Sequence, residues 1–153
     1  MLIPTMASGQ VKPFRTVVSP EKAKSYLRKS FLKIMKRNPT SAELQMLAAH
    51  SAMETRRWQA MWWYNFGNSV ATSSTKTWYT LKEASKHRYK AFKSAQEGSD
   101  YFVNLLKNRF SKAWSVLGSE NPRLYAQALK EDRYYEAPID KYTESLQANY
   151  ASV

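Results

Sequence analysis

The chain of 153 residues carries a net charge of +12 and is 43% hydrophobic and 14% aromatic. These values favour one folded domain with a hydrophobic core and argue against a disordered chain. The absence of cysteine excludes a disulfide framework and any cysteine-ligated zinc site. No apolar run reaches the length of a transmembrane segment, and the N-terminus lacks the apolar core of a signal peptide. The basic composition favours an anionic partner, either nucleic acid, an acidic membrane surface or an acidic cell-wall polymer.

Residues 1–18 are punctuated by Pro, Gly and Ser, and we expect them to form an extended N-terminal arm ahead of a folded domain at residues 19–153. The first helix begins at this boundary, because Ser19 can cap it and Pro20 suits its first position. Apolar residues then recur at helical spacing, while the other face of the helix is rich in Lys and Arg. The Asn-Pro pair at residues 38–39 should end this helix.

A second helix begins at the sequence TSAE, in which Thr40 and Glu43 have the spacing of a capping box. It should end near residues 55–57, before a cluster of aromatic residues. The segment that follows is rich in Thr, Ser and Tyr and has no helical period. It predicts a loop or small hairpin around residues 76–81 and then a short extended piece at residues 88–92.

Helices resume at SAQE, where Ser94 and Glu97 again have capping-box spacing. The apolar stripe that follows predicts one long helix, which stops at Gly118. A further helix opens at the Asn-Pro pair of residues 121–122, and a last helix follows an interruption at residues 133–138. The chain is therefore predicted to be mostly helical, with one irregular insertion in its middle.

Glu54 lies on the apolar stripe of the second helix, because it follows Leu47 by seven residues and Ser51 by three. An acid in this position lies against the core or at the lip of a cleft. Desolvation and the negative end of the helix dipole both raise the pKa of a carboxyl group there, as a general acid requires. Pairing with Arg56 or Arg57 would lower that pKa, and a structural ion pair is the commoner role of a single helix acid.

Five aromatic residues lie within nine positions after this acid: Trp58, Trp62, Trp63, Tyr64 and Phe66. Such clusters usually form core, but three consecutive rings cannot all face one side of a helix, so some should be exposed. Exposed rings beside polar groups suit sugar rings or nucleobases. Asn65 and Asn68 could donate amide hydrogen bonds to a ligand, and Gly67 permits a tight turn or a close ligand approach. We therefore predict that residues 62–68 bind substrate.

Other chemistry has little support in the sequence. His50 lies one helical turn before Glu54, where we expect it to adjust the acid from behind or to lie at the surface. His87 lies between two cations and should be exposed. Two scattered histidines form no metal site, and four glycines form no phosphate-binding loop. We expect neither a metal nor a cofactor.

Three segments are similar, in order, to a known set of motifs. AAHSAMETRRW…YNFGN is similar to A-x-x-A-L-E-[ST]-G…N-x-F-G, HRYKAFKSAQEGSDY to F-R-x-Y-x-S-x-x-E-S-x-x-D-Y, and NPRLYAQALKEDRYYEAPIDKY to A-x-A-L…G-Y-x-T-D-P-x-Y. Over residues 40–150 the chain thereby resembles lysozyme-like enzymes that cleave peptidoglycan, especially flagellar and autolysin-type N-acetylglucosaminidases and related phage lysins. The resemblance implies a mainly α, lysozyme-like domain with a small irregular or β insertion and an active-site cleft.

The resemblance also assigns roles to particular residues. It makes Glu54 the catalytic acid and places Thr55 beside it as the small hydroxyl residue, which we expect to contact the substrate. It puts the block at residues 65–68 on the cleft floor. It places a tyrosine near the cleft, for which Tyr134 and Tyr135 are equal contenders. This tyrosine orients the substrate or the intermediate.

Glycoside cleavage normally uses a second carboxyl group as nucleophile or base, and the sequence does not identify this residue clearly. Glu83 could be brought over the cleft by a mobile loop, although a solvated loop acid is its commoner role, and Glu97 is better explained as a helix cap. Relatives can instead use the substrate's own N-acetyl group, which gives hydrolysis, or attack by a sugar hydroxyl, which gives lytic transglycosylation. The sequence leaves both chemistries open.

Two positions depart from the motifs. Arg56 stands where the family has Gly after E-[ST], and Arg133 stands where it has Gly before the tyrosine. Arg56 bears on the local turn and on the charge of Glu54, so an inactive relative remains an alternative.

Two alternative functions would involve other binding partners. A nucleic-acid-binding protein would use the segment KHRYKAFK, which interleaves cations with aromatic rings, although no recognised DNA-binding motif organises it. A virion protein could keep the fold for assembly alone. The favoured partner is peptidoglycan, with other virion proteins as a further option and nucleic acid less favoured. Action in the bacterial cell wall or periplasm would follow release from the host cytoplasm or delivery in a phage particle.

Overall fold

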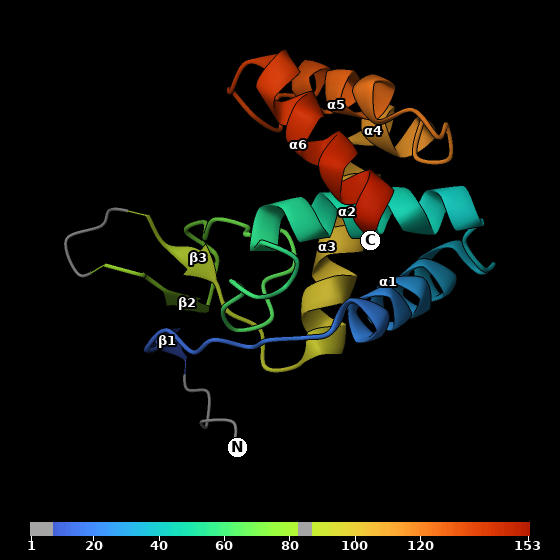
Figure 1. Ribbon diagram of the computed structural model, residues 1–153. Coiled ribbons are helices and arrows are strands. Elements are labelled where there is room, and N and C mark those ends of the chain that lie inside the picture. Colours follow the sequence, from blue (N-terminus) through green and yellow to red (C-terminus); the bar gives the residue numbers. More distant parts are fainter. Residues whose placement is uncertain (1–7, 83–86) are drawn as a thin grey trace.

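The structure is a computed structural model that describes residues 8–82 and 87–153. Within these ranges the chain forms six helices and three short strands (Figure 1). The helices are α1 (Pro20–Met35), α2 (Ser41–Thr55), α3 (Ala95–Arg109), α4 (Ser111–Ser115), α5 (Pro122–Glu131) and α6 (Ile139–Ser152). The strands are β1 (Gly9–Gln10), β2 (Thr77–Tyr79) and β3 (Tyr89–Lys90). The prediction of a mainly helical domain with a small β insertion is confirmed, and Glu83 lies outside the described residues.

Side-chain caps begin the helices where the sequence predicts them. The Ser19 side chain accepts the Lys22 amide at the start of α1, and Asn121 caps α5 in the same way. Thr40 and Glu43 form a reciprocal capping box at the start of α2. Local side-chain chemistry therefore sets these three helix starts.

The prediction of one long helix that runs to Gly118 is wrong, because the helical conformation is interrupted at Phe110. Helix α3 ends at Arg109, and Phe110 takes φ −127° and ψ 58°, outside the helical region. The break lets the Phe110 ring pack edge-on against Tyr134, with 4.8 Å between the ring centroids, while α4 packs on α5. Apolar spacing could not reveal this break, since both pieces keep the helical period.

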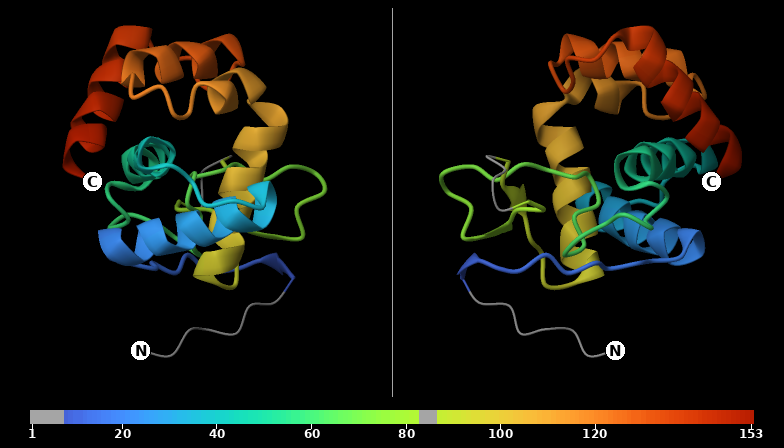
Figure 2. Two further views of the ribbon diagram at one scale, coloured as in Figure 1. Left: turned by 90° about the vertical axis from the view of Figure 1, so that its right-hand side faces the viewer. Right: turned by 60° about the vertical axis from the view of Figure 1, so that its left-hand side comes forward.

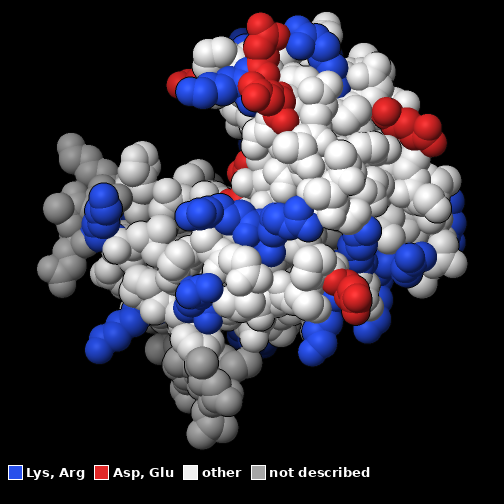
Figure 3. All heavy atoms as spheres, viewed as in Figure 1, with Lys and Arg blue, Asp and Glu red and all other residues white. Residues whose placement is uncertain are grey.

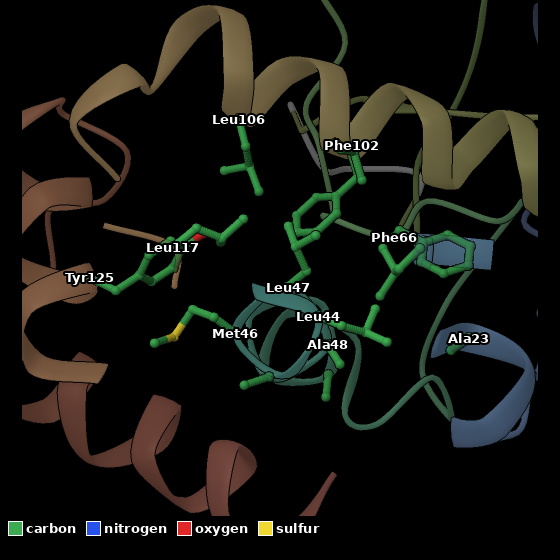
Figure 4. Packing of buried hydrophobic residues seen from close by; sticks show 14 of the residues in the cluster. Ala23, Leu44, Met46, Leu47, Ala48, Phe66, Phe102, Leu106, Leu117 and Tyr125 are labelled. Carbon is green, nitrogen blue, oxygen red and sulfur yellow. The ribbon is translucent and has the colours of Figure 1, made fainter. Parts of the chain in front are cut away.

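Helix α2 passes through the centre of the molecule and is buried over most of its surface. Helices α1 and α3 pack together on one side of it, and α6 packs against it on the other side, next to α5 (Figures 1 and 2). Phe102 and Leu106 of α3 point toward Leu47 in the core, whereas Met46 lies on the Tyr125 side of α2 (Figure 4). Burial on nearly every side holds α2 firmly, so the position of its C-terminal end is well defined.

The strands form a small sheet in the order β1-β2-β3, in which β2 pairs in parallel with β1 and antiparallel with β3. The extended piece predicted at residues 88–92 is confirmed, because it contains β3. The loop or small hairpin predicted around residues 76–81 is instead the single strand β2, whose antiparallel partner is β3. Beyond β1, the extended chain of residues 11–18 runs beside residues 58–64, where the Thr16 amide donates to the Met61 carbonyl at 2.8 Å. The described part of the N-terminal arm is therefore fastened to the insertion. Each helix in the described ranges is too short or too polar to span a lipid bilayer.

Candidate active site

A left-handed turn ends α2 directly after the candidate acid. Arg56, Arg57 and Trp58 have φ of 49°, 57° and 61°, a conformation that residues with a Cβ seldom adopt. The buried Thr55 hydroxyl donates to the Ser51 carbonyl at 2.8 Å and accepts the Trp58 amide at 3.0 Å. Thr55 therefore holds the turn together, and we do not carry it forward as a substrate contact.

Both arginines at glycine positions of the motifs take this left-handed conformation. Arg56 has φ 49°, and Arg133, directly before Tyr134, has φ 63°. Glycine adopts such φ values without steric cost. The backbone therefore keeps the turns that the motifs imply, although the side chains differ.

Neither arginine beside Glu54 pairs with its carboxyl group. Arg57 donates to the hydroxyl and the carbonyl oxygen of Ser152 in α6, at 2.6 Å and 3.0 Å. Arg56 is exposed and lines a separate hollow with Trp62. Among the described residues, no side chain forms a hydrogen bond or an ion pair with the Glu54 carboxyl group.

Glu54 opens into a groove with a volume of about 310 Å³. Besides the end of α2, the groove is walled by the loop at residues 67–72, by one face of α3 and by the loop between α5 and α6. Figure 3 shows the molecule hollowed between the helical lobe of α4–α6 and the β insertion. The lining residues are Glu54, Gly67, Asn68, Ser69, Val70, Thr72, Tyr101, Leu105, Arg109, Phe110 and Tyr134.

Burial controls the protonation of Glu54. Withdrawal of the carboxyl group from water raises its pKa to about 7. This direction agrees with the shift predicted from the place of Glu54 on the apolar stripe. A substantial share of molecules therefore carries the acid proton at neutral pH, as a general acid requires.

His50, behind Glu54, is buried and does not lie at the surface. Its Nδ1 is hydrogen-bonded to the Tyr125 hydroxyl at 2.7 Å, and its Nε2 to the Tyr142 hydroxyl at 3.4 Å. Burial lowers the pKa of His50 to about 3, so the ring is neutral. It also packs edge-on against the Tyr134 ring, with 4.8 Å between the centroids. His50 therefore helps to position Tyr134.

The structure separates the two candidate tyrosines. Tyr134 lines the groove with Glu54, and burial together with the nearby carboxylate raises the pKa of Tyr134 well above its usual range. Tyr135 instead stacks on Tyr142 of α6, with 3.7 Å between the centroids, and donates to the Ala126 carbonyl of α5 at 2.8 Å. Tyr134 therefore keeps its proton beside the acid, whereas Tyr135 joins α5 to α6.

The tryptophan-rich cluster does not supply the rings beside the acid. Trp63 and Phe66 are buried, and the Trp63 indole N–H donates to a carbonyl of the N-terminal arm at 2.7 Å. The prediction that part of the cluster is exposed holds for Trp62 and Tyr64, which are half-buried. These two residues line other hollows, so we leave residues 62–64 and Phe66 out of the site.

The three remaining residues of the predicted cleft floor have two different roles. Gly67 and Asn68 line the groove, as the resemblance implies. An added Cβ at Gly67 would lie 2.6 Å from the Phe102 ring, so glycine permits this close packing. The Asn65 side chain points inward and donates to two carbonyls, of the adjoining loop and of β3, at 3.0 Å each. Asn65 therefore fixes the loop that carries Gly67 and Asn68.

Sequence reasoning missed one face of α3. Tyr101, Leu105 and Arg109 are spaced by four residues and line the groove, while Phe102 and Leu106, one position further on, face the core. The signal was present in the sequence, because the apolar stripe of this helix is wider than one buried face. The other unforeseen lining residues are Ser69, Val70, Thr72 and Phe110.

Glu54 is the only carboxylic acid among the described residues that line the groove. Asp100 turns toward α1, where it pairs with Lys33, and Glu97 pairs with Lys93. In the part of the chain that the structure describes, no group of three or more His, Cys, Asp or Glu side chains could hold a metal ion.

Comparison of the sequence with known protein families and with curated proteins finds no match. Solved structures do match. The glycoside hydrolase domain of Salmonella typhimurium FlgJ aligns over 88% of this chain and 87% of its own, with a TM-score of 0.56 and 19% identity. A peptidoglycan hydrolase from Sphingomonas sp. A1 aligns over 88% of this chain and 94% of its own, with a TM-score of 0.61 and 20% identity. This chain therefore has the mainly α, lysozyme-like fold of these domains, as its motifs predicted.

Proposed function

We propose that this protein cleaves the glycan strands of peptidoglycan, with Glu54 as its single general acid. One observation carries the proposal: a carboxyl group with a pKa of about 7 opens into a groove and has no cationic partner among the described residues. The similar solved structures are a glycoside hydrolase domain and peptidoglycan hydrolases, which supports the same class of substrate.

The proposed reaction begins with proton transfer from Glu54 to the glycosidic oxygen. The bond between C1 and that oxygen breaks as positive charge develops on the sugar ring, and the leaving sugar departs as an alcohol. The carbonyl oxygen of the neighbouring N-acetyl group bonds to the electron-deficient C1 in place of a second carboxyl group, which is not found among the described lining residues. Water then adds to C1 and displaces the N-acetyl oxygen, whose bond to C1 breaks, while the ionised Glu54 takes a proton from the water, which restores the acid. The net reaction is hydrolysis.

Tyr134 has a positioning role in this scheme. Its hydroxyl stays protonated because its pKa is raised well above the usual range, so it can donate a hydrogen bond to the N-acetyl group or to the developing intermediate.

Attack on C1 by the substrate's own 6-hydroxyl group, in place of the N-acetyl oxygen and water, would give an anhydro sugar and make the protein a lytic transglycosylase.

The setting that we propose is a phage lysin or a virion-associated protein that acts on the bacterial cell wall. The net charge of +12 supports this setting, because peptidoglycan and its attached acidic polymers are anionic. The alternative is a basic nucleic-acid-binding or structural protein that keeps the fold without catalysis. Salt-sensitive DNA binding together with the absence of wall cleavage would favour it.

The test uses purified peptidoglycan and three proteins: wild type, Glu54→Gln and Glu144→Gln. Glu144 is exposed on α6 and provides a control with the same Glu→Gln substitution away from the groove. Wild type and control should clear the suspension, whereas Glu54→Gln should lose about 100-fold or more of the rate. Mass spectrometry of the products then identifies the bond, since glucosaminidase, muramidase and transglycosylase leave reducing glucosamine, reducing muramic acid and anhydro ends. Equal rates for wild type and Glu54→Gln would contradict the proposal.

A further inference from the structure

A second hollow adjoins the groove of Glu54 at Tyr101, whose side chain lines both. This hollow has a volume of about 240 Å³ and lies on the β2–β3 hairpin. Its other lining residues are Thr75, Lys76, Thr77, Lys90, Ala91 and Phe92. The Phe92 and Tyr101 rings lie 5.3 Å apart between centroids, so an aromatic wall joins the two hollows. An extended polymer over Glu54 can therefore continue past Tyr101 onto the hairpin.

Two cations flank Tyr101 along this path. Arg109 lies two helical turns further along the same face of α3 and lines the groove of Glu54. Lys90 of β3 places its Nζ 5.0 Å from the Tyr101 ring centroid and donates to the Thr75 hydroxyl at 2.9 Å. Within residues 8–82 and 87–153, neither cation forms an ion pair. Both charges are therefore open to a ligand.

The position of Arg109 is compatible with an uncharged Glu54. Burial accounts for the raised pKa of Glu54, whereas the charge of Arg109 acts on Tyr101, whose pKa it lowers against the larger effect of burial. A guanidinium group paired with Glu54 would instead keep the acid ionised. Arg109 can thus hold an anionic group of the substrate and leave the proton on Glu54.

An aromatic ring between two cations suits a sugar that carries a carboxylate nearby, because Arg and Lys donate charge-assisted hydrogen bonds to such acids. Peptidoglycan supplies these acids, since alternate sugars carry a lactyl group and a peptide with free carboxylates. A chitin-type polymer of N-acetylglucosamine has none. We propose that Arg109 and Lys90 bind the carboxylates of the peptide-bearing sugars and so select peptidoglycan over uncharged glycans. This inference rests on the proposed function, because it assigns a selectivity to the same groove.

The test measures binding in the Glu54→Gln background, in which the ligand is not consumed. The two glycan probes are chitohexaose, which is uncharged, and soluble peptidoglycan fragments that keep their stem peptides. A single-stranded oligonucleotide is the third ligand, which tests for nucleic-acid binding. Arg109→Gln removes a cation from the groove of Glu54, and Lys90→Gln removes one from the second hollow. Lys107→Gln on a different face of α3 is the charge-matched control. Arg109 is exposed at the end of its helix, so its replacement leaves the fold intact.

Arg109→Gln and Lys90→Gln should each weaken binding of the acidic fragment about 10-fold and leave chitohexaose binding unchanged. The control should bind both probes as the parent does. In the active enzyme, the same substitutions should raise KM for peptidoglycan with little change in kcat.

Four outcomes would overturn the inference. Equal losses for both probes, or no loss for the acidic fragment, would remove charge selection while the cleavage assay still supports the proposed function. Tighter binding of a single-stranded oligonucleotide than of the acidic fragment would assign the cations to nucleic acid. No binding of either glycan, together with no cleavage by wild type, would remove the proposed function as well.

Discussion

Glu54 at the end of α2 and Tyr134 in the loop between α5 and α6 line the same groove, and His50 of α2 packs edge-on against the Tyr134 ring. Both residues therefore depend on one buried helix. The helix brings Glu54 to the groove directly and positions Tyr134 through His50. This arrangement explains how two residues far apart in the sequence can hold a fixed relation in the proposed site.

Activity should fall as the pH rises through about 7, because the Glu54 carboxyl group, whose pKa burial raises to about 7, must be protonated to donate. The fall in kcat/KM should approach about tenfold per pH unit above that value. The Glu144→Gln control should give the same profile as wild type. A rate that stays constant from pH 6 to 9, values of roughly one unit below and two above this pKa, would count against Glu54 as the acid.

The stability of the Glu54→Gln variant should exceed that of wild type at alkaline pH. The pKa of Glu54 is about 7 in the folded chain, against 4.5 for a free side chain, so the unfolded state loses its proton first as pH rises. Wild type should therefore lose up to about 3 kcal/mol of unfolding free energy between these two pKa values, and the variant should not. His50 is present in both proteins, so its own titration cancels in the difference.

Urea denaturation of both proteins at several pH values measures this difference. The advantage of Glu54→Gln should grow with pH from about 4.5 and become constant above about 7. A difference that does not change with pH would show that the Glu54 pKa is the same in the folded and unfolded states.

Two Tyr→Phe substitutions should separate the roles of Tyr134 and Tyr135. Tyr134→Phe keeps the ring packed on His50 and removes the hydroxyl group beside Glu54, so the cleavage rate should fall about 10- to 100-fold with little change in melting temperature. Tyr135→Phe loses the hydrogen bond to Ala126, so it should cost about 1 kcal/mol of unfolding free energy with little change in rate. The reverse pattern would assign the role in catalysis to Tyr135.

Because Arg56 and Arg133 have a left-handed backbone conformation, we expect glycine to be more stabilising than alanine at both positions. At each position the Gly variant should be more stable than the Ala variant by about 1 kcal/mol, because only Gly adopts this φ without strain. Gln147, exposed within α6, should show the opposite order by about 1 kcal/mol, as expected inside a helix. Thermal melting of the six variants gives the comparison, and the same order at all three positions would contradict it.

Much of the helical framework could be predicted because its signals are local. Ser19, Thr40 and Asn121 mark helix starts through hydrogen bonds to backbone amides within the next turn. The break at Phe110 could not be predicted in this way. At the break the Phe110 ring packs against the Tyr134 ring, which comes from a distant part of the chain.

The candidate site, too, could be predicted only where local sequence signals determine it. The place of Glu54 on its apolar stripe and the direction of its pKa shift follow from the period of one helix. Its aromatic neighbours do not, because Tyr101 and Tyr134 reach the groove through the packing of α3 and of the α5–α6 loop. The nearer rings of Trp63 and Phe66 were stronger candidates by sequence distance, but the N-terminal arm and the core cover them.

The most direct test of the central claim is the pKa of the Glu54 side chain itself. The carboxyl carbon can be followed by NMR in protein labelled with ¹³C-glutamate, with Glu54→Gln identifying the signal. We expect a titration midpoint of about 7. A midpoint at or below the free-glutamate value of 4.5 would show an ionised carboxylate at neutral pH and would contradict the role of Glu54 as a general acid.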